Sequence, residues 1–225
     1  MKAKHFNRGA RSYFRGVPQH ATASGKTILI VSEGKETEPQ YFNALKNRLK
    51  LGAAIIVTVA KGTDAKSVVE SAKRLRKERA CEVRQGRSVP FDEVWCVFDS
   101  ESHQNRPHLA EALVMARDNK IKVALSWPCI EFWFLLHETY TSAAFSDYAS
   151  VEKVLKKYYP EYQKNDVPTA ALLEKLVTAV VNARQLRADN AKSGSKEPAT
   201  NADLLACSMN EATRLGLKYS MPPEK

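Results

Sequence analysis

The chain has 225 residues, of which 44% are hydrophobic and 27% charged, proportions typical of a soluble globular protein with a single core or one and a half domains. We expect no membrane-spanning segment, because no apolar run approaches the length of a bilayer span and the first residues contain no apolar signal region. The formal net charge of +10 favours a polyanionic partner, with nucleic acid ahead of an anionic membrane surface. The sequence therefore predicts a soluble, cytoplasmic protein that binds nucleic acid and not a membrane.

The cysteines give no sign of a structural metal site. Four are present, with no C-x-x-C pair and no Cys/His cluster at zinc-ligand spacing: Cys81, Cys96, Cys129 and Cys207. Cys96 and Cys129 lie inside apolar runs and are expected to be inert core residues. Sparse, unpaired cysteines suit a reducing cytosol.

The first 26 residues form a basic segment. They contain six lysines and arginines and no acidic residue, and glycine and proline interrupt any periodicity. We predict an extended basic arm in which Arg8, Arg11 and Arg15 contact the phosphates of a nucleic acid without regard to its sequence. A solvated terminus without such a role is the alternative interpretation.

Residues 27–138 alternate short apolar runs with helical patterns. The runs predict four strands, at 27–32, 53–59, 91–98 and 121–127, and the segments between and after them predict four helices, at 37–50, 64–84, 105–119 and 129–138. Thr37 and Asp64 are expected to cap the first two helices. A β-α-β-α-β-α-β-α order implies a mostly parallel four-stranded sheet with helices on both faces.

Residues 139–225 have no further strand-like run and predict a helical C-terminal region. The expected helices are 151–159, 168–190 and 201–217, and a polar loop is expected at 192–198. The helix over 168–190 has leucines and valines at helical spacing along one face. We expect this region to be a helical extension that can pack on the sheet domain.

Acidic residues follow two of the predicted strands directly. Glu33 ends the first strand, and Asp99 and Glu101 end the third. The carboxyl ends of parallel strands meet at the edge where α/β proteins bind ligands, so these carboxylates are expected to converge. Clustered carboxylates repel one another unless a cation lies among them, and hard oxygen ligands suit Mg²⁺ or Mn²⁺. Helix capping is the simpler alternative for each residue alone.

Three more residues are placed near the same edge by their positions in the chain. Glu131 lies in the first turn of the helix after the fourth strand and could supply a fourth metal ligand. Lys35 could contact a scissile phosphate, and His103 could transfer a proton or bind phosphate. Solvent exposure and an ordinary loop position are equally good interpretations of these last two. Glu38 is assigned to the helix N-terminus and His137 to the core.

The predicted helix over 64–84 is rich in basic residues, and Arg74 and Lys77 are its candidate nucleic-acid contacts. A solvated helix face is the plainer interpretation of most of them. There is no Walker A pattern, no G-x-G-x-x-G and no G-x-S-x-G, so nothing indicates a nucleotide-driven motor or an esterase.

Four segments of the chain resemble the RloB-like family: ILIVSEGKETEPQYF (28–42), VWCVFDSE (94–101), SWPCIEFWFLLH (126–137) and EPATN (197–201). This resemblance implies a Toprim-type metal-binding α/β domain and an association with prokaryotic restriction and phage-defence loci. Toprim proteins use a glutamate after the first strand and an Asp-x-Asp after the third. Glu33 and Asp99 match that pattern, whereas Glu101 replaces the second aspartate with a longer side chain.

Residues and resemblance together predict a Mg²⁺- or Mn²⁺-dependent endonuclease of an antiviral defence system. The catalytic set is Glu33, Asp99 and Glu101, assisted by Lys35 and His103. Structured RNA such as tRNA is favoured as substrate, because the defence effectors that the chain resembles often disable translation. A DNA endonuclease or nickase with the same site and a non-catalytic nucleic-acid-binding or sensing subunit are the alternatives. A defence-system partner or activator and a homo-oligomer are further expectations.

Overall fold

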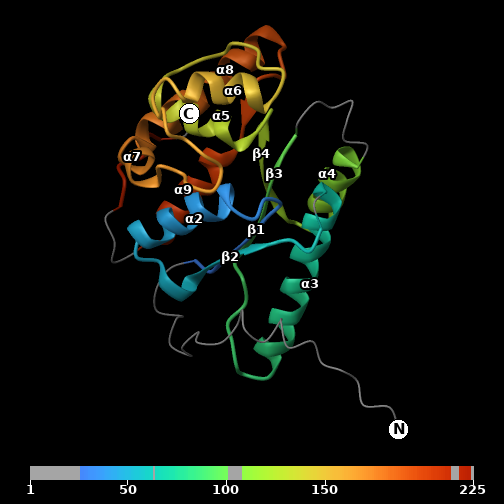
Figure 1. Ribbon diagram of the computed structural model, residues 1–225. Helices are drawn as coiled ribbons and strands as arrows, with labels where there is room; N and C mark the ends of the chain where they lie inside the picture. Colours follow the sequence, from blue (N-terminus) through green and yellow to red (C-terminus); the bar gives the residue numbers. More distant parts are fainter. Residues whose placement is uncertain (1–25, 63, 101–107, 214–217, 224–225) are drawn as a thin grey trace.

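The computed structural model describes residues 26–62, 64–100, 108–213 and 218–223 and shows an α/β fold (Figure 1). Its five-stranded sheet has the order β2-β1-β3-β4-β5. The strands are β1 (Ile28–Ser32), β2 (Ile55–Val59), β3 (Glu93–Asp99), β4 (Lys122–Trp127) and β5 (Ala199–Thr200). The first four run parallel, and β5 pairs antiparallel with β4. The mostly parallel sheet expected from the sequence is confirmed, with one strand more than predicted.

Strand β1, which lies between β2 and β3, is apolar on both faces because both faces are covered by helices. Ile28 and Ile30 belong to one core cluster, and the intervening Leu29 and Val31 belong to a second cluster on the other face. All five residues of β1 are buried. A strand buried on both sides reads as a continuous apolar run, which explains why the sequence marks it so clearly.

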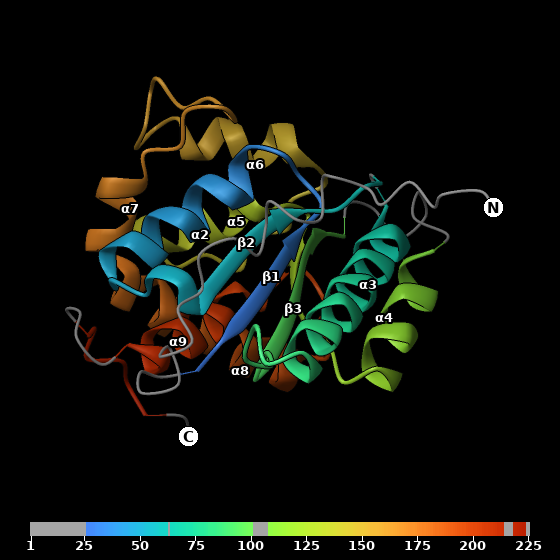
Figure 2. The same cartoon turned by 90° about the horizontal axis from the view of Figure 1, so that it is seen from below.

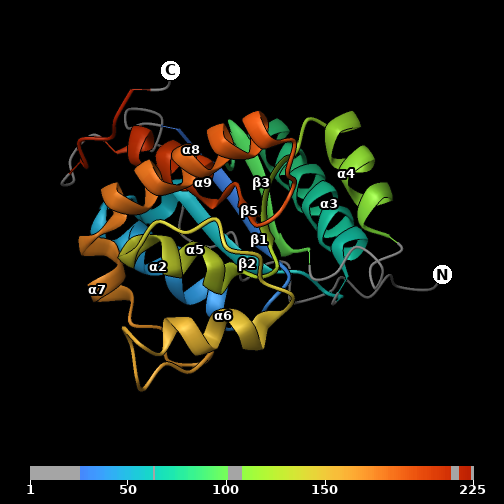
Figure 3. The same ribbon diagram turned by 90° about the horizontal axis from the view of Figure 1, so that it is seen from above.

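Helices α3 (Ala65–Arg84) and α4 (Leu109–Asp118) cover one face of the sheet. The other face carries α2 (Thr37–Arg48), α5 (Ile130–Glu138), α6 (Tyr148–Leu155), α7 (Thr169–Glu174), α8 (Leu176–Ser193) and α9 (Ala202–Ala212). Figures 2 and 3 show these two layers from opposite sides of the molecule. Among the described residues, none of these helices is long and apolar enough to cross a lipid bilayer.

The region after residue 138 shares the core of the sheet domain. It contributes strand β5 to the sheet, and its leucines pack in the same cluster as α2 and α5. The prediction that this region holds no strand is wrong, because two paired residues are too short to show any periodicity. The single helix predicted over 168–190 is in fact two helices that break at Lys175, where α7 packs on α2 and α8 packs on α5.

Helix α2 begins at Thr37 but does not use that residue as its N-cap. The cap position is Glu36, whose side chain makes no capping hydrogen bond. The Thr37 hydroxyl instead donates to the main-chain carbonyl of Lys164, at 3.1 Å. The predicted cap at Asp64 is confirmed, since its carboxylate accepts a hydrogen bond from the Ser67 amide.

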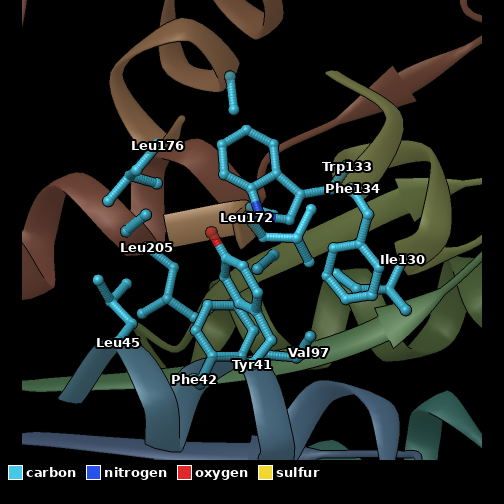
Figure 4. Close-up of a cluster of buried hydrophobic side chains, with 14 of the residues drawn as sticks. Tyr41, Phe42, Leu45, Val97, Ile130, Trp133, Phe134, Leu172, Leu176 and Leu205 are labelled. Atoms are coloured by element: carbon cyan, nitrogen blue, oxygen red, sulfur yellow. The ribbon is translucent and has the colours of Figure 1, made fainter. Parts of the chain in front are cut away.

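The larger core cluster is centred on aromatic residues of α2 and α5 (Figure 4). Tyr41, Trp133 and His137 are fully buried and in mutual ring contact. His137 Nδ1 lies 2.9 Å from the Trp133 carbonyl oxygen, which only accepts, so Nδ1 carries the proton. The Tyr41 hydroxyl then donates to His137 Nε2 at 3.0 Å. The expectation that His137 is a satisfied core residue is confirmed.

We expect the free energy of unfolding to fall as the pH drops from about 6.5 to 4, because the buried His137 resists protonation. Burial lowers the pKa of His137 from 6.5 to about 4. As the pH falls, the unfolded chain therefore binds this proton at a higher pH than the folded chain does. The free energy of unfolding is highest above pH 6.5 and falls by about 3 kcal/mol on acidification. Urea unfolding between pH 7.5 and 4.5 measures this loss.

The matched control for this pH dependence is the exposed His108. The His108→Gln variant should keep the wild-type pH profile, whereas His137→Gln should flatten it between pH 6.5 and 4. A wild-type profile as flat as that of His137→Gln would show that His137 does not control acid stability.

Candidate active site

The candidate site lies where the sheet reverses its strand order. The chain leaves β1 for β2 on one side and later returns to place β3 on the other, so the carboxyl ends of β1 and β3 form the topological switch point. Ligands of open α/β sheets bind in the crevice at such a point. Glu33 follows β1 there, and its amide donates to the Val97 carbonyl of β3 at 3.0 Å. Asp99 is the last residue of β3 and pairs with Ser126 of β4.

Glu131 reaches the same edge from the first turn of α5, which follows β4 directly. Its carboxylate is 1% exposed, and Oε1 accepts a hydrogen bond from the Tyr162 hydroxyl at 2.9 Å. The second oxygen, Oε2, is buried and has no hydrogen-bond partner among the described residues. Burial and the charges of Glu131 and Asp99 raise the pKa of the Cys129 thiol, so both carboxylates act on this side chain.

Glu38 is the site residue that the sequence interpretation missed. Its expected place at the helix N-terminus is confirmed, since it lies in the first turn of α2, but it is also only 5% exposed and folded back so that its Oε1 accepts a hydrogen bond from the Gly34 amide at 3.0 Å. Burial raises its pKa, and the charges of Glu131 and Glu33 add to that effect. The charges of Glu33 and Glu131 therefore both act on the Glu38 carboxylate. The sequence feature that could have predicted this contact is a glutamate four residues after Gly34, the glycine of the turn between a strand and a helix.

Replacing Gly34 by alanine should displace Glu38 from the site. A Cβ at position 34 would lie 2.2 Å from Glu38 Oε2 and 2.8 Å from its Cδ, closer than real contacts allow. The carboxylate would have to rotate away and lose its bond to the residue-34 amide. We expect Gly34→Ala to lower Mn²⁺ affinity about as much as Glu38→Ala, measured by calorimetric titration.

A double variant separates this steric effect from general damage to the turn. In Gly34→Ala/Glu38→Ala the clash is absent, so its Mn²⁺ affinity should equal that of Glu38→Ala alone. A further loss in the double variant would mean that Gly34 acts independently of Glu38.

The chemistry of these side chains fits a divalent cation. Glu33, Glu38, Asp99 and Glu131 supply carboxylate oxygens from three neighbouring strand ends and helix starts. The buried Oε2 of Glu131 is a lone acceptor that a cation would satisfy. Hard oxygen ligands of this kind suit Mg²⁺ and Mn²⁺. In the part of the chain that the structure describes, no three Asp, Glu, His or Cys side chains are already arranged as a metal-holding group.

The family assignment follows from the extent of a single match. A model of the RloB-like protein family matches residues 28–209. The chain belongs to this family. No curated protein and no solved structure matches the chain. The matched span includes all five strands and the four candidate carboxylates, so these residues lie inside the region that defines this RloB-like protein.

Two exposed lysines follow strands at the carboxyl edge of this RloB-like protein, and a third lies near the start of α2. Lys35 follows β1 and Lys61 follows β2, and both are exposed at the carboxyl edge. Lys164 lies beside the start of α2, where its carbonyl accepts from Thr37, and its ammonium group sits 3.8 Å from the centre of the Tyr148 ring. Positive charges at this edge favour the binding of a polyanion such as a phosphodiester. The phosphate contact predicted for Lys35 remains a prediction.

The other predicted nucleic-acid contacts lie farther from the site or outside the described residues. Arg74 and Lys77 lie about 14 and 18 Å along the axis of α3 from its first residue, which faces the carboxyl edge. Arg74 pairs with Glu78 one turn later, while Lys77 is exposed. The predicted residues outside the described part of the chain are Arg8, Arg11, Arg15, Glu101 and His103.

Proposed function

We propose that this protein is a metal-dependent endonuclease of an antiviral defence system, acting on nucleic acid and favouring structured RNA such as tRNA. The observation that carries the proposal is the buried Glu131 carboxylate, which keeps one oxygen without a hydrogen bond in the described structure and whose charge acts on Glu38 and, together with that of Asp99, on Cys129. A structural role alone leaves no reason to bury an unsatisfied acid among others. A divalent cation supplies that reason.

Glu33, Glu38, Asp99 and Glu131 would hold the ion, with Glu101 as the further ligand implied by the family resemblance. A bound Mg²⁺ or Mn²⁺ at such a site supplies charge stabilisation and a more acidic water for phosphodiester cleavage. Lys35 then neutralises the scissile phosphate from the exposed side of the loop. His103 is the proposed proton carrier for the leaving oxygen.

The substrate class rests on charge and on the family. A net charge of +10 and the lysines around the site favour a polyanion over a small neutral substrate. The preference for RNA comes from the resemblance to defence effectors that disable translation. A DNA endonuclease would use the same site, so the experiment must offer both polymers.

Regulation is part of the same proposal. An endonuclease active at all times would damage its own cell, so we infer an activating partner or trigger from the defence system. Self-association into a homo-oligomer is an additional way to control the site.

The test is an assay of the full chain against total tRNA, single-stranded DNA and supercoiled plasmid, each with Mg²⁺, Mn²⁺ or EDTA. Cleavage of tRNA with either metal, abolished by EDTA, is the expected result. Cleavage of plasmid alone would replace RNA with DNA as the substrate. Tight binding without cleavage of any polymer, including after addition of infected-cell extract, would favour a non-catalytic binding subunit.

A further inference from the structure

Tyr162 lies outside the strands and helices that carry the acidic residues, yet it touches the site directly. Its side chain is 2% exposed, and its hydroxyl donates to Glu131 Oε1 at 2.9 Å. The ring also packs against Phe134 of α5, one turn after Glu131. Tyr162 therefore contacts α5 at two points, the Glu131 carboxylate and the Phe134 ring.

The turn that carries Tyr162 is also tied to α2, the helix that carries Glu38. The Gln40 side chain accepts a hydrogen bond from the Val167 amide at 3.1 Å, and Thr37 donates to the carbonyl of Lys164. These bonds tie Lys164 and Val167 of the 162–167 turn to the first turn of α2. The same short segment thus contacts the two helices that carry Glu38 and Glu131.

We propose that Tyr162 is a positioning residue that orients the Glu131 carboxylate so that its Oε2 faces the metal, and that the 162–167 turn sets the spacing between Glu131 and Glu38. This proposal rests on the proposed function, because it requires a cation at Glu131. The hydroxyl occupies Oε1 and leaves Oε2 as the atom available to the ion. Hydrogen-bonded partners of this kind fix the direction of carboxylate ligands.

The chain offers a matched control in Tyr159. Its hydroxyl donates to Glu138 at the end of α5, so it forms a second tyrosine–glutamate bond in the same region but outside the acidic cluster. Tyr159→Phe and Tyr162→Phe each remove one hydroxyl from a comparable pair. Thermal melts of both variants report general damage to the fold.

The experiment titrates Mn²⁺ into the full-length wild type, Tyr162→Phe and Tyr159→Phe, with melting temperatures measured in parallel. We expect Tyr162→Phe to weaken Mn²⁺ binding about tenfold or more, the range found for partners of metal ligands, and Tyr159→Phe to leave it unchanged. In cleavage assays the metal concentration for half-maximal rate should rise in Tyr162→Phe, while the rate at saturating metal changes less.

The possible outcomes separate this proposal from the function on which it rests. Wild-type affinity in Tyr162→Phe, with Mn²⁺ binding intact in the wild type, would overturn the positioning role alone. Equal weakening in both tyrosine variants would also overturn it, since the effect would then be structural. If Tyr162→Phe does not fold, Thr37→Val, which removes a bond that anchors the turn, should weaken Mn²⁺ binding in its place. Absence of Mn²⁺ binding in the wild type would overturn the proposed function and the positioning role together.

Discussion

Replacing Asp99 by asparagine is expected to reduce cleavage by about two to four orders of magnitude, because the proposed site then loses a metal ligand and with it several kcal/mol of transition-state stabilisation. Asp99 ends the central strand β3 beside Glu33 and acts on Cys129 together with Glu131. Asparagine keeps the shape of the side chain and removes its charge. The affinity for nucleic acid should change little, since the exposed lysines remain.

The control for Asp99→Asn is Asp118→Asn at the exposed end of α4, where the carboxylate pairs only with its neighbour Arg117 among the described contacts. This variant should cleave at the wild-type rate. Initial rates at saturating Mg²⁺ and a filter-binding affinity measured in EDTA separate chemistry from binding. Cleavage at the wild-type rate by Asp99→Asn would show that the active site does not lie at this strand end.

Replacing Arg187 by alanine is expected to destabilise the fold by about 3–5 kcal/mol, because it leaves a buried carboxylate without its partner. Arg187 of α8 binds Asp203 of α9 through two hydrogen bonds of 2.6 and 2.7 Å, and it also donates to the Thr200 carbonyl of β5. The Asp203 side chain is fully buried, whereas that of Arg187 is 32% exposed. This pair holds the fifth strand and the last helix against the rest of the core.

The control for Arg187→Ala uses the difference in exposure between Arg187 and Asp203. Asp203→Ala leaves an arginine that water can still reach, so it should be less destabilising than Arg187→Ala. Urea unfolding of the two variants compares their free energies of unfolding directly. An equal or larger loss in Asp203→Ala would mean that the buried carboxylate is not the main source of the instability.

The parts of the fold that the sequence predicts well are those with local signals. Apolar runs ended by turn residues locate the first four strands, and Glu33 and Asp99 follow directly as strand-end residues. The position of Glu131 is predicted in the same way, because Pro128 marks the start of α5. These positions depend on hydrophobic periodicity and on the geometry of parallel strands, both of which are visible in one short segment.

The residues that the sequence does not predict depend on contacts between distant segments. Glu38 is buried by tertiary packing, and Tyr162 reaches Glu131 from a turn that is itself hydrogen-bonded to α2. Thr37 has the chemistry of an N-cap, but a tertiary bond to Lys164 takes its hydroxyl. Strand β5 forms by pairing with β4, which its own two residues do not reveal.

The most direct test of the account is the number of Mn²⁺ ions bound by the purified chain, measured by electron paramagnetic resonance. We predict saturable binding of at least one ion in the wild type and its loss in Asp99→Asn, with Asp118→Asn unchanged. Binding that is absent from the wild type, or equal in wild type and Asp99→Asn, would contradict a metal site at the carboxyl edge of β1 and β3.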